Sequence, residues 1–246
     1  MRILDLDLDF FLDSKANGIN LTSGLRLESE YYKPDSKEAV REFLTTKCGL
    51  NSNSKVNGCL YTHHDEVFYD IRSKIESGII TEPFDIDHID AHADLGLGDC
   101  THVYVMTELI HEIPSQRLYP RESEINPGNF LLYLVISRWV ANLTYVYHPD
   151  TYHMDFPHSL FRGGVGASCI LEVKKYSKGT DVTNRKNEPV GIDEPIIINS
   201  VSRVDFNAAG AYDFVYLTQS PEFTPIESDE LISVFEEFIV FESRTE

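Results

Sequence analysis

The sequence FDIDHIDAHAD, residues 84–94, decides how the chain is arranged. Its first half alternates polar and apolar residues, the period-2 pattern of a β-strand. It ends in Asp90, His92 and Asp94, and the following Leu-Gly-Leu-Gly is typical of a loop. Residues spaced by two share one side of an extended backbone, so these side chains are expected to converge beyond a strand's C-terminal end, where open α/β sheets bind ligands. Such a group needs a cation among its members, which predicts a metal site; the alternative is a polar loop with an incidental histidine.

A second acidic cluster lies near the N-terminus. Residues 2–12 are predicted to form a strand in which leucines alternate with Asp5, Asp7 and Asp9. The leucines would face a core, and three carboxylates on the opposite face are costly unless they are solvated or bind a cation. Alone, this pattern would indicate an edge strand with a solvated face. With the first cluster present, a shared metal site becomes the better interpretation.

A third element, His63-His64-Asp65, follows a short strand predicted at residues 59–61. Four aspartates and two histidines suit hard or borderline divalent ions such as Mn²⁺. The four carboxylates carry a charge that two divalent cations would offset, and a two-metal centre activates water as a nucleophile near neutral pH. We therefore expect two divalent ions such as Mn²⁺ per chain, with these ligands: Asp7, Asp9, Asp90, Asp94, His92 and a histidine of the His63-His64 pair.

The alternation of predicted strands and helices favours one domain, residues 1–246, built on a doubly wound, mostly parallel sheet with flanking helices. The length of 246 residues, with 42% hydrophobic, suits a large α/β core. Helices are predicted at residues 36–45, 66–77, 129–139 and 226–238, and further strands at 143–147, 195–201 and 213–217. Residues 101–110 could be either helix or strand, and residues 150–192 indicate hairpins or a surface excursion.

The composition also narrows the choice of partners and location. A formal net charge of −19 argues against nucleic acid and anionic membranes and favours cations, including metal ions and guanidinium or basic peptide substrates. No signal peptide and no apolar stretch of about 20 residues is found, and the four separated cysteines suggest reduced thiols. We expect a cytoplasmic protein, and a homo-oligomer stays possible.

The metal motifs resemble those of a known family. Asp90-Ala91-His92-Ala93-Asp94 resembles the D-A-H-x-D signature of the arginase (ureohydrolase) superfamily, which binds two manganese ions, and Asp7-x-Asp9 resembles its D-x-D motif. LDLDLDFF, HHDEV and HIDAHADL together resemble the small atypical arginase-like group that includes peptide arginases. Those enzymes hydrolyse arginine side chains in ribosomally made peptides to ornithine. The resemblance covers the metal-binding strands and only loosely the rest of the chain.

The resemblance implies roles for individual residues. Asp7 and Asp90 would bridge the two ions, His64 and Asp94 would complete one shell, and His92 and Asp9 the other.

Outside the metal ligands, the resemblance implies substrate contacts. Gly128-Asn129 is similar to a Gly-Asn pair that contacts substrate in arginases. Glu222-Phe223-Thr224-Pro225 resembles the family's E-x-x-P, whose carboxylate holds the guanidinium; the alternative is that Glu222 caps a helix beginning near Pro225. His63 is a candidate for proton transfer, with His102 and His153 as the other candidates.

Three features depart from the family pattern. The D-x-D motif precedes His64 and Asp90 here, whereas it follows the equivalent residues in arginases, so the motif order is permuted. The third aspartate of the family's D-x-D-x-x-D-P falls on Leu12, and its proton-shuttle histidine falls on Leu131. The expected fold is thus arginase/deacetylase-like with permuted motifs.

The sequence leads to the hypothesis of a binuclear manganese hydrolase that converts arginine side chains of a precursor peptide to ornithine and urea. One alternative is a metal-dependent deacylase of the related deacetylase branch, which needs one zinc and fewer carboxylates. The other is a non-catalytic metal-binding protein with a closed site.

Overall fold

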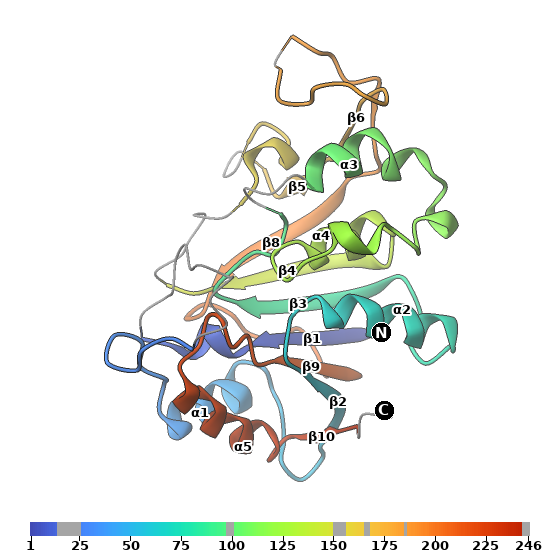
Figure 1. The fold of residues 1–246 in the computed structure, drawn as a ribbon. Coiled ribbons are helices and arrows are strands. Elements are labelled where there is room, and N and C mark those ends of the chain that lie inside the picture. The colour runs from blue at the N-terminus through green and yellow to red at the C-terminus, as the bar shows by residue number, and fades with distance from the viewer. Residues whose placement is uncertain (14–25, 97–100, 150–155, 165–167, 185, 243–246) are drawn as a thin grey trace.

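A large, mostly parallel β-sheet forms the centre of the molecule in the computed structural model, which describes residues 1–246 except 14–25, 97–100, 150–155, 165–167, 185 and 243–246 (Figure 1). Eight strands lie in the order β10-β2-β9-β1-β3-β4-β8-β5, and within this sheet only β5 pairs antiparallel. A separate two-stranded sheet joins β6 and β7. The expected α/β class with a mostly parallel sheet is confirmed. The strands are β1 (Arg2–Asp7), β2 (Val56–Tyr61), β3 (Phe84–Asp90), β4 (Val140–Tyr147), β5 (Ile170–Leu171), β6 (Lys174–Lys175), β7 (Gly191–Ile192), β8 (Ile196–Ser202), β9 (Phe214–Thr218) and β10 (Ile239–Phe241).

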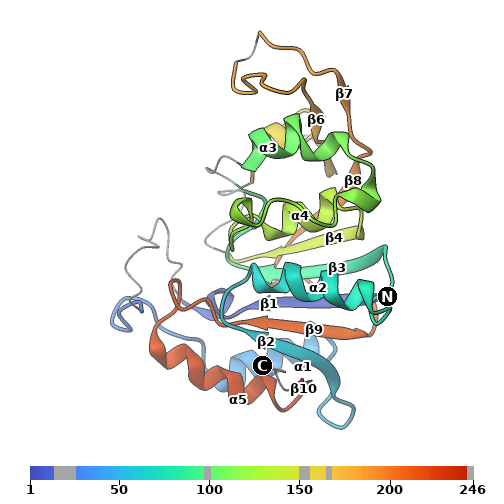
Figure 2. The same cartoon turned by 45° about the vertical axis from the view of Figure 1, so that its right-hand side comes forward.

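Helices cover both faces of this sheet. The side chains of α2 and α4 join one buried apolar cluster, and those of α1 and α5 join another on the opposite face (Figure 2). The α-helices are α1 (Lys37–Thr46), α2 (Glu66–Glu76), α3 (Thr101–Thr107), α4 (Phe130–Ile136) and α5 (Ile232–Phe235). The 3-10 helices are η1 (Leu8–Phe11), η2 (Leu109–His111), η3 (Pro114–Gln116), η4 (Glu122–Glu124), η5 (His158–Leu160) and η6 (Ile226–Leu231).

Alternation along β1 separates its apolar and acidic residues between these two faces. Leu4 and Leu6 pack into the cluster of α1 and α5, as their spacing predicts. Ile3 packs into the cluster of α2 and α4. Asp5 and Asp7 share the face of Ile3 because side chains two apart point the same way. The carboxylates are therefore directed toward the side on which α2 and α4 lie.

Two predicted elements differ from those in the structure. The strand expected to continue to residue 12 ends at Asp7, because the Asp7 side chain accepts the backbone N–H of Asp9 and begins η1. Residues 226–238, expected to form one helix, form the 3-10 helix η6 and then the single turn of α5, and the short strand β10 follows at Ile239. Its apolar spacing fits either helix type, since residues three apart lie close in both.

Other local predictions hold. Ser36 caps α1 by accepting the backbone N–H of Ala39. The undecided residues 101–110 are helical, as α3 and the start of η2. The part of residues 150–192 that is described contains β5, β6 and β7.

The direction in which the chain crosses the sheet changes at β1. β2 lies on one side of β1, beyond β9, whereas β3 lies directly on the other side. Open α/β sheets bind ligands at such a switch point, beyond the C-terminal ends of the strands. The ends of β1, β3 and β9 meet there, since these three strands are parallel neighbours.

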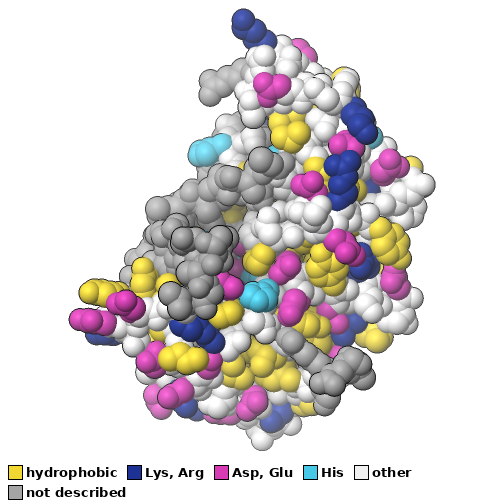
Figure 3. All heavy atoms as spheres, viewed as in Figure 1, with side chains coloured by type: hydrophobic (Ala, Val, Ile, Leu, Met, Phe, Trp, Pro, Cys, Tyr) yellow, Lys and Arg dark blue, Asp and Glu magenta, His cyan; other side chains and the backbone are white. Residues whose placement is uncertain are grey.

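Acidic side chains are dispersed among apolar and basic ones over the face shown in Figure 3. Much of the formal net charge of −19 thus lies on the surface instead of in one cluster. Across the described ranges, no helix combines the length and the apolar character that a membrane crossing requires.

Close packing at Gly58 holds β2 against β9. A Cβ atom at this position would lie 2.4 Å from the carbonyl oxygen of Val215 and 2.8 Å from Cγ2 of Ile239. We expect Gly58→Ala to lower the free energy of unfolding by about 1–3 kcal/mol, because backbone must move to admit the methyl group. Urea denaturation measures this loss. Gly210→Ala is the matched control, since a Cβ there has no neighbour within 4 Å; equal stability of both variants would contradict the prediction.

Candidate metal centre

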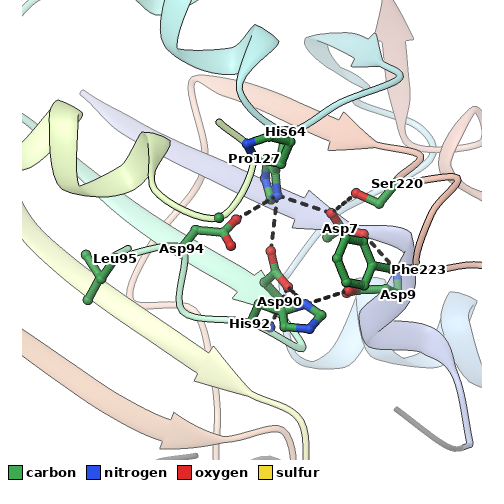
Figure 4. A pocket seen from close by; sticks show the side chains of 11 residues that line it. Asp7, Asp9, His64, Asp90, His92, Asp94, Leu95, Pro127, Ser220 and Phe223 are labelled. Atoms are coloured by element: carbon green, nitrogen blue, oxygen red, sulfur yellow. Dashed lines mark hydrogen bonds and ion pairs between the residues drawn. The ribbon is translucent and has the colours of Figure 1, made fainter. Parts of the chain in front are cut away.

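The six candidate ligands meet in one cavity at the C-terminal end of the sheet (Figure 4). Asp7 ends β1, and Asp9 lies in η1 directly after it. Asp90 ends β3, and His92 and Asp94 follow it in the next loop. His64 lies in the turn between β2 and α2. The cavity has a volume of about 150 Å³. Its other lining residues are Leu95, Pro127, Gly128, Ser220 and Phe223.

Three carboxylates converge on one nitrogen of His64. Its Nδ1 lies 3.1 Å from an oxygen of each of Asp7, Asp90 and Asp94. An imidazole nitrogen carries at most one hydrogen, so it can donate to only one of these oxygens. Around an octahedral ion with bonds of about 2.1 Å, neighbouring ligand atoms lie about 3 Å apart. Within this set, Asp7, His64 and Asp90 offer ligand atoms that all lie within 4.8 Å of one another, so these three residues could hold one metal ion.

A second ligand group adjoins the first. Nδ1 of His92 lies 2.8 Å from Oδ2 of Asp9 and 3.6 Å from Oδ1 of Asp90. Asp90 therefore directs one oxygen toward His64 and the other toward His92. Asp90 thus belongs to two neighbouring groups of side chains, each of which could hold a metal ion.

Asp7 belongs clearly to the first group. Its Oδ2 faces His64, whereas its Oδ1 accepts the backbone N–H of Asp9 at 2.9 Å. Asp7 is expected to bridge two ions, and it would have to do so through Oδ2, because Oδ1 already accepts a hydrogen bond.

Behind the candidate ligands lies a buried pair that the sequence analysis did not assign to the site. Nε2 of His64 lies 3.2 Å from both oxygens of Asp5, and Nδ1 of His88 lies 2.7 Å from Oδ2 of Asp5. His88 in turn reaches the carbonyl oxygen of His92 through Nε2, at 3.2 Å. A carboxylate behind a metal-binding histidine fixes its tautomer and ring orientation. The alternation of Asp5 with Asp7, and of His88 with Asp90, was the available signal, because each pair shares a face.

Aromatic rings support the two histidines. The ring of His64 stacks on Phe130, with centroids 4.4 Å apart, and the ring of His92 meets Phe223 edge to face at 4.8 Å. Phe130 is fully buried at the start of α4. These contacts restrict the rotation of the two imidazole rings.

Burial and mutual repulsion raise the pKa of two carboxyl groups. The pKa of Asp9 lies well above its usual value, first because of burial and then because Asp7 and Asp90 are near. Burial and the charge of Asp90 raise the pKa of Asp94 to about 7.

The histidines show the complementary effect. Burial alone would lower the pKa of His64, but the negative charge and hydrogen bonds of Asp5, with further hydrogen bonds to the ligand carboxylates, raise it well above its usual value. Burial alone would also lower the pKa of His92, but the charges and hydrogen bonds of Asp9, and then of Asp90, raise it well above its usual value. Without a metal the group favours bound protons, which a divalent cation would displace.

Glu222 and His63 lie next to each other but not among the residues that line the cavity. Oε2 of Glu222 lies 3.5 Å from Nδ1 of His63, and the His63 side chain is 44% exposed. The residue at the N-cap of η6 is Pro225. The carboxylate of Glu222 thus faces an exposed histidine, close in sequence to the cavity residues Ser220 and Phe223.

Asn129 is fully buried and supports a loop of the cavity wall. Its Nδ2 donates to the carbonyl oxygen of Glu124, and its Oδ1 accepts the backbone N–H of Asn126. The structure thus places Gly128, and not Asn129, among the lining residues.

The other proton-transfer candidates do not line this cavity within the described structure. Nε2 of His102 lies 3.1 Å from the carbonyl oxygen of Leu95, and His153 lies outside the described residues. Leu131, at the position of the arginase shuttle histidine, is buried in the core.

Comparison with known proteins adds no family assignment. No protein-family model matches the chain, and no curated protein sequence matches it. The class that the structure defines is an α/β protein with buried aspartate and histidine groups able to hold metal ions.

Metal binding should stabilise the fold through Asp90. We expect Mn²⁺ at 100 times its Kd to raise the free energy of unfolding by about 2.7 kcal/mol, and a chelator to reverse this rise. Asp90→Asn should remove the response, because Asp90 belongs to both ligand groups. Thermal unfolding with and without Mn²⁺ measures it.

Asp87→Asn is the matched control. Asp87 lies on the same strand, is also buried, and binds Arg2 and Tyr212 away from the cavity. This variant should be less stable but should keep the full shift with Mn²⁺. A wild-type protein whose unfolding does not change with Mn²⁺ would contradict the metal assignment.

Proposed function

We propose that this protein is a binuclear manganese hydrolase that converts arginine side chains of a ribosomally made peptide to ornithine and urea. The observation that carries the proposal is the arrangement of oxygens 3.1 Å from Nδ1 of His64, with a second ligand group that shares Asp90. The motif resemblance to peptide arginases supplies the reaction.

The donor set favours manganese. Carboxylate oxygens predominate over imidazole nitrogens, and the described residues that line the cavity include no cysteine. Such a set suits Mn²⁺ better than a soft-ligand metal. When bound, two such ions activate water for attack on carbon and polarise the group under attack.

The cavity suits a small cationic group. A volume of about 150 Å³ corresponds to roughly five water molecules, which leaves space for the planar head of an arginine but not for a whole peptide. Leu95, Pro127 and Phe223 supply apolar walls that would contact the side chain. No lysine or arginine is among the described residues that line the cavity, so these residues offer no cation to a free α-carboxylate, which favours an arginine within a peptide.

The residues beside the cavity supply binding and proton transfer in this proposal. The carboxylate of Glu222 pairs with the guanidinium NH₂ groups, leaving its present partner His63. Water adds to the guanidinium carbon, and the bond from this carbon to the side-chain nitrogen breaks. Nδ1 of His63 moves a proton to that nitrogen, so the products are urea and the ornithine ammonium group.

Urea release tests the reaction directly. We expect Mn²⁺-dependent urea formation from an arginine-containing peptide and little from free arginine, because no lysine or arginine among the described lining residues could bind the carboxylate of a free amino acid. A colorimetric urea assay, with mass spectrometry for the loss of CN₂H₂ from the peptide, measures both. Urea from free arginine at the same rate would contradict the peptide preference, and no urea from either substrate would contradict the function.

Glu222→Gln tests recognition of the cation. A charged hydrogen bond is worth about 1.5–3 kcal/mol, so the KM for the peptide should rise about 10- to 100-fold. Affinity for Mn²⁺ should not change, because Glu222 does not line the cavity. Glu227→Gln, at an exposed position of η6, is the control. An unchanged KM in Glu222→Gln would remove this residue from substrate binding.

A further inference from the structure

Ser220 has a place in the site that no sequence motif indicated. It follows β9, lines the cavity, and is 6% exposed. Its Oγ donates a hydrogen bond to Oδ2 of Asp7. Figure 4 shows Ser220 and His64 on either side of the Asp7 carboxylate.

We propose that Ser220 is a positioning residue that makes Asp7 bind metal through Oδ2 alone. This inference rests on the proposed metal site. In this proposal, the hydroxyl of Ser220 determines which oxygen of Asp7, and which lone pair of that oxygen, faces an ion.

The hydrogen bonds of Asp7 carry this argument. Oδ1 accepts the backbone N–H of Asp9 at 2.9 Å, which directs this oxygen toward η1. Oδ2 accepts from Ser220 and lies 3.1 Å from Nδ1 of His64. A carboxylate oxygen has two lone pairs, so Oδ2 keeps one for an ion after the serine has occupied the other, and Asp7 would then bind one ion and not bridge two. The carboxylate is thereby prevented from turning to bind one ion with both oxygens.

The backbone of Ser220 is held as firmly as its hydroxyl. Its φ is 44°, a left-handed value that is costly for a residue other than glycine and persists only where the surroundings enforce it. The N–H of Ser220 donates to the carbonyl oxygen of Thr62 at 3.0 Å, and the N–H of Gln219 donates to that of Tyr61 at 2.9 Å. Oγ1 of Thr224 donates to the carbonyl oxygen of Ser220 at 3.0 Å.

These bonds connect Ser220 with two ligands at once. The hydroxyl acts on Asp7, and the backbone joins the segment Tyr61-Thr62 that leads into His64. A strained residue held in this way at the edge of a cavity is typical of a functional position. The loop after β9 thus connects the Asp7 carboxylate at the end of β1 with the turn after β2 that carries the His64 imidazole.

Two substitutions separate the hydroxyl from the backbone. Ser220→Gly removes the hydroxyl and accepts the positive φ without strain, whereas Ser220→Ala removes the hydroxyl and keeps the strain. In both variants we expect one of the two Mn²⁺ to bind about 10- to 100-fold more weakly, as is usual when a partner behind a metal ligand is lost. Ser220→Gly should unfold at the same temperature as the wild type or at a higher one.

Calorimetric titration with Mn²⁺ measures affinity and stoichiometry, and electron paramagnetic resonance reports whether the two ions remain coupled. Ser228→Ala is the control: its hydroxyl is also buried but has no hydrogen-bond partner among the described residues, so Mn²⁺ binding should not change. If Ser220→Gly binds two ions with wild-type affinity, the inference is overturned. This holds even if Ser220→Ala binds weakly, because the strained backbone, and not the missing hydroxyl, would then account for the weaker binding. If the wild type itself binds no Mn²⁺, both this inference and the proposed function fail. If the wild type and both Ser220 variants bind Mn²⁺ equally well, only the role of Ser220 is contradicted.

Discussion

The mutual repulsion of buried carboxylates is the constraint on which the rest of the structure depends. Asp7, Asp9, Asp90 and Asp94 lie almost out of contact with solvent within one small cavity. Burying such charges costs far more than a fold can recover unless cations or protons balance them. A single N–H of His64 cannot donate to all three oxygens near it, and the side-chain groups around it could hold metal ions.

The sheet makes this arrangement possible by dividing each strand between two faces. On β1 the leucines contribute to one core, while Asp5 and Asp7 face the other side; on β3, His88 and Asp90 share a face in the same way. The apolar clusters on both faces stabilise the strands. The same clusters hold the carboxylates near one another against their repulsion. Gly58 packs closely against β9, and this contact fixes the spacing between β9 and β2, the strand that leads to His64.

Groups behind and beside the candidate ligands fix the orientation of their side chains. Asp5 holds His64 from behind, Phe130 and Phe223 limit the rotation of the two imidazoles, and Asn129 supports the loop that supplies Gly128. The described lining of the cavity combines carboxylates with the apolar side chains of Leu95, Pro127 and Phe223, and Phe223 is adjacent in sequence to Glu222, the partner of His63.

The sequence by itself determined the local part of this site. The spacing of Asp90, His92 and Asp94 after a strand, and the alternation of Asp7 with leucines, predicted which residues meet, because strand geometry sets the direction of side chains two apart. Only the tertiary structure decided the partners that come from distant segments. Ser220 lies 213 positions from Asp7 and Asp5 lies 59 from His64, and no local pattern records such a contact. The same reason explains why Asn129 supports a loop: a side-chain amide binds whatever backbone groups the fold brings to it, and these depend on packing and not on sequence spacing.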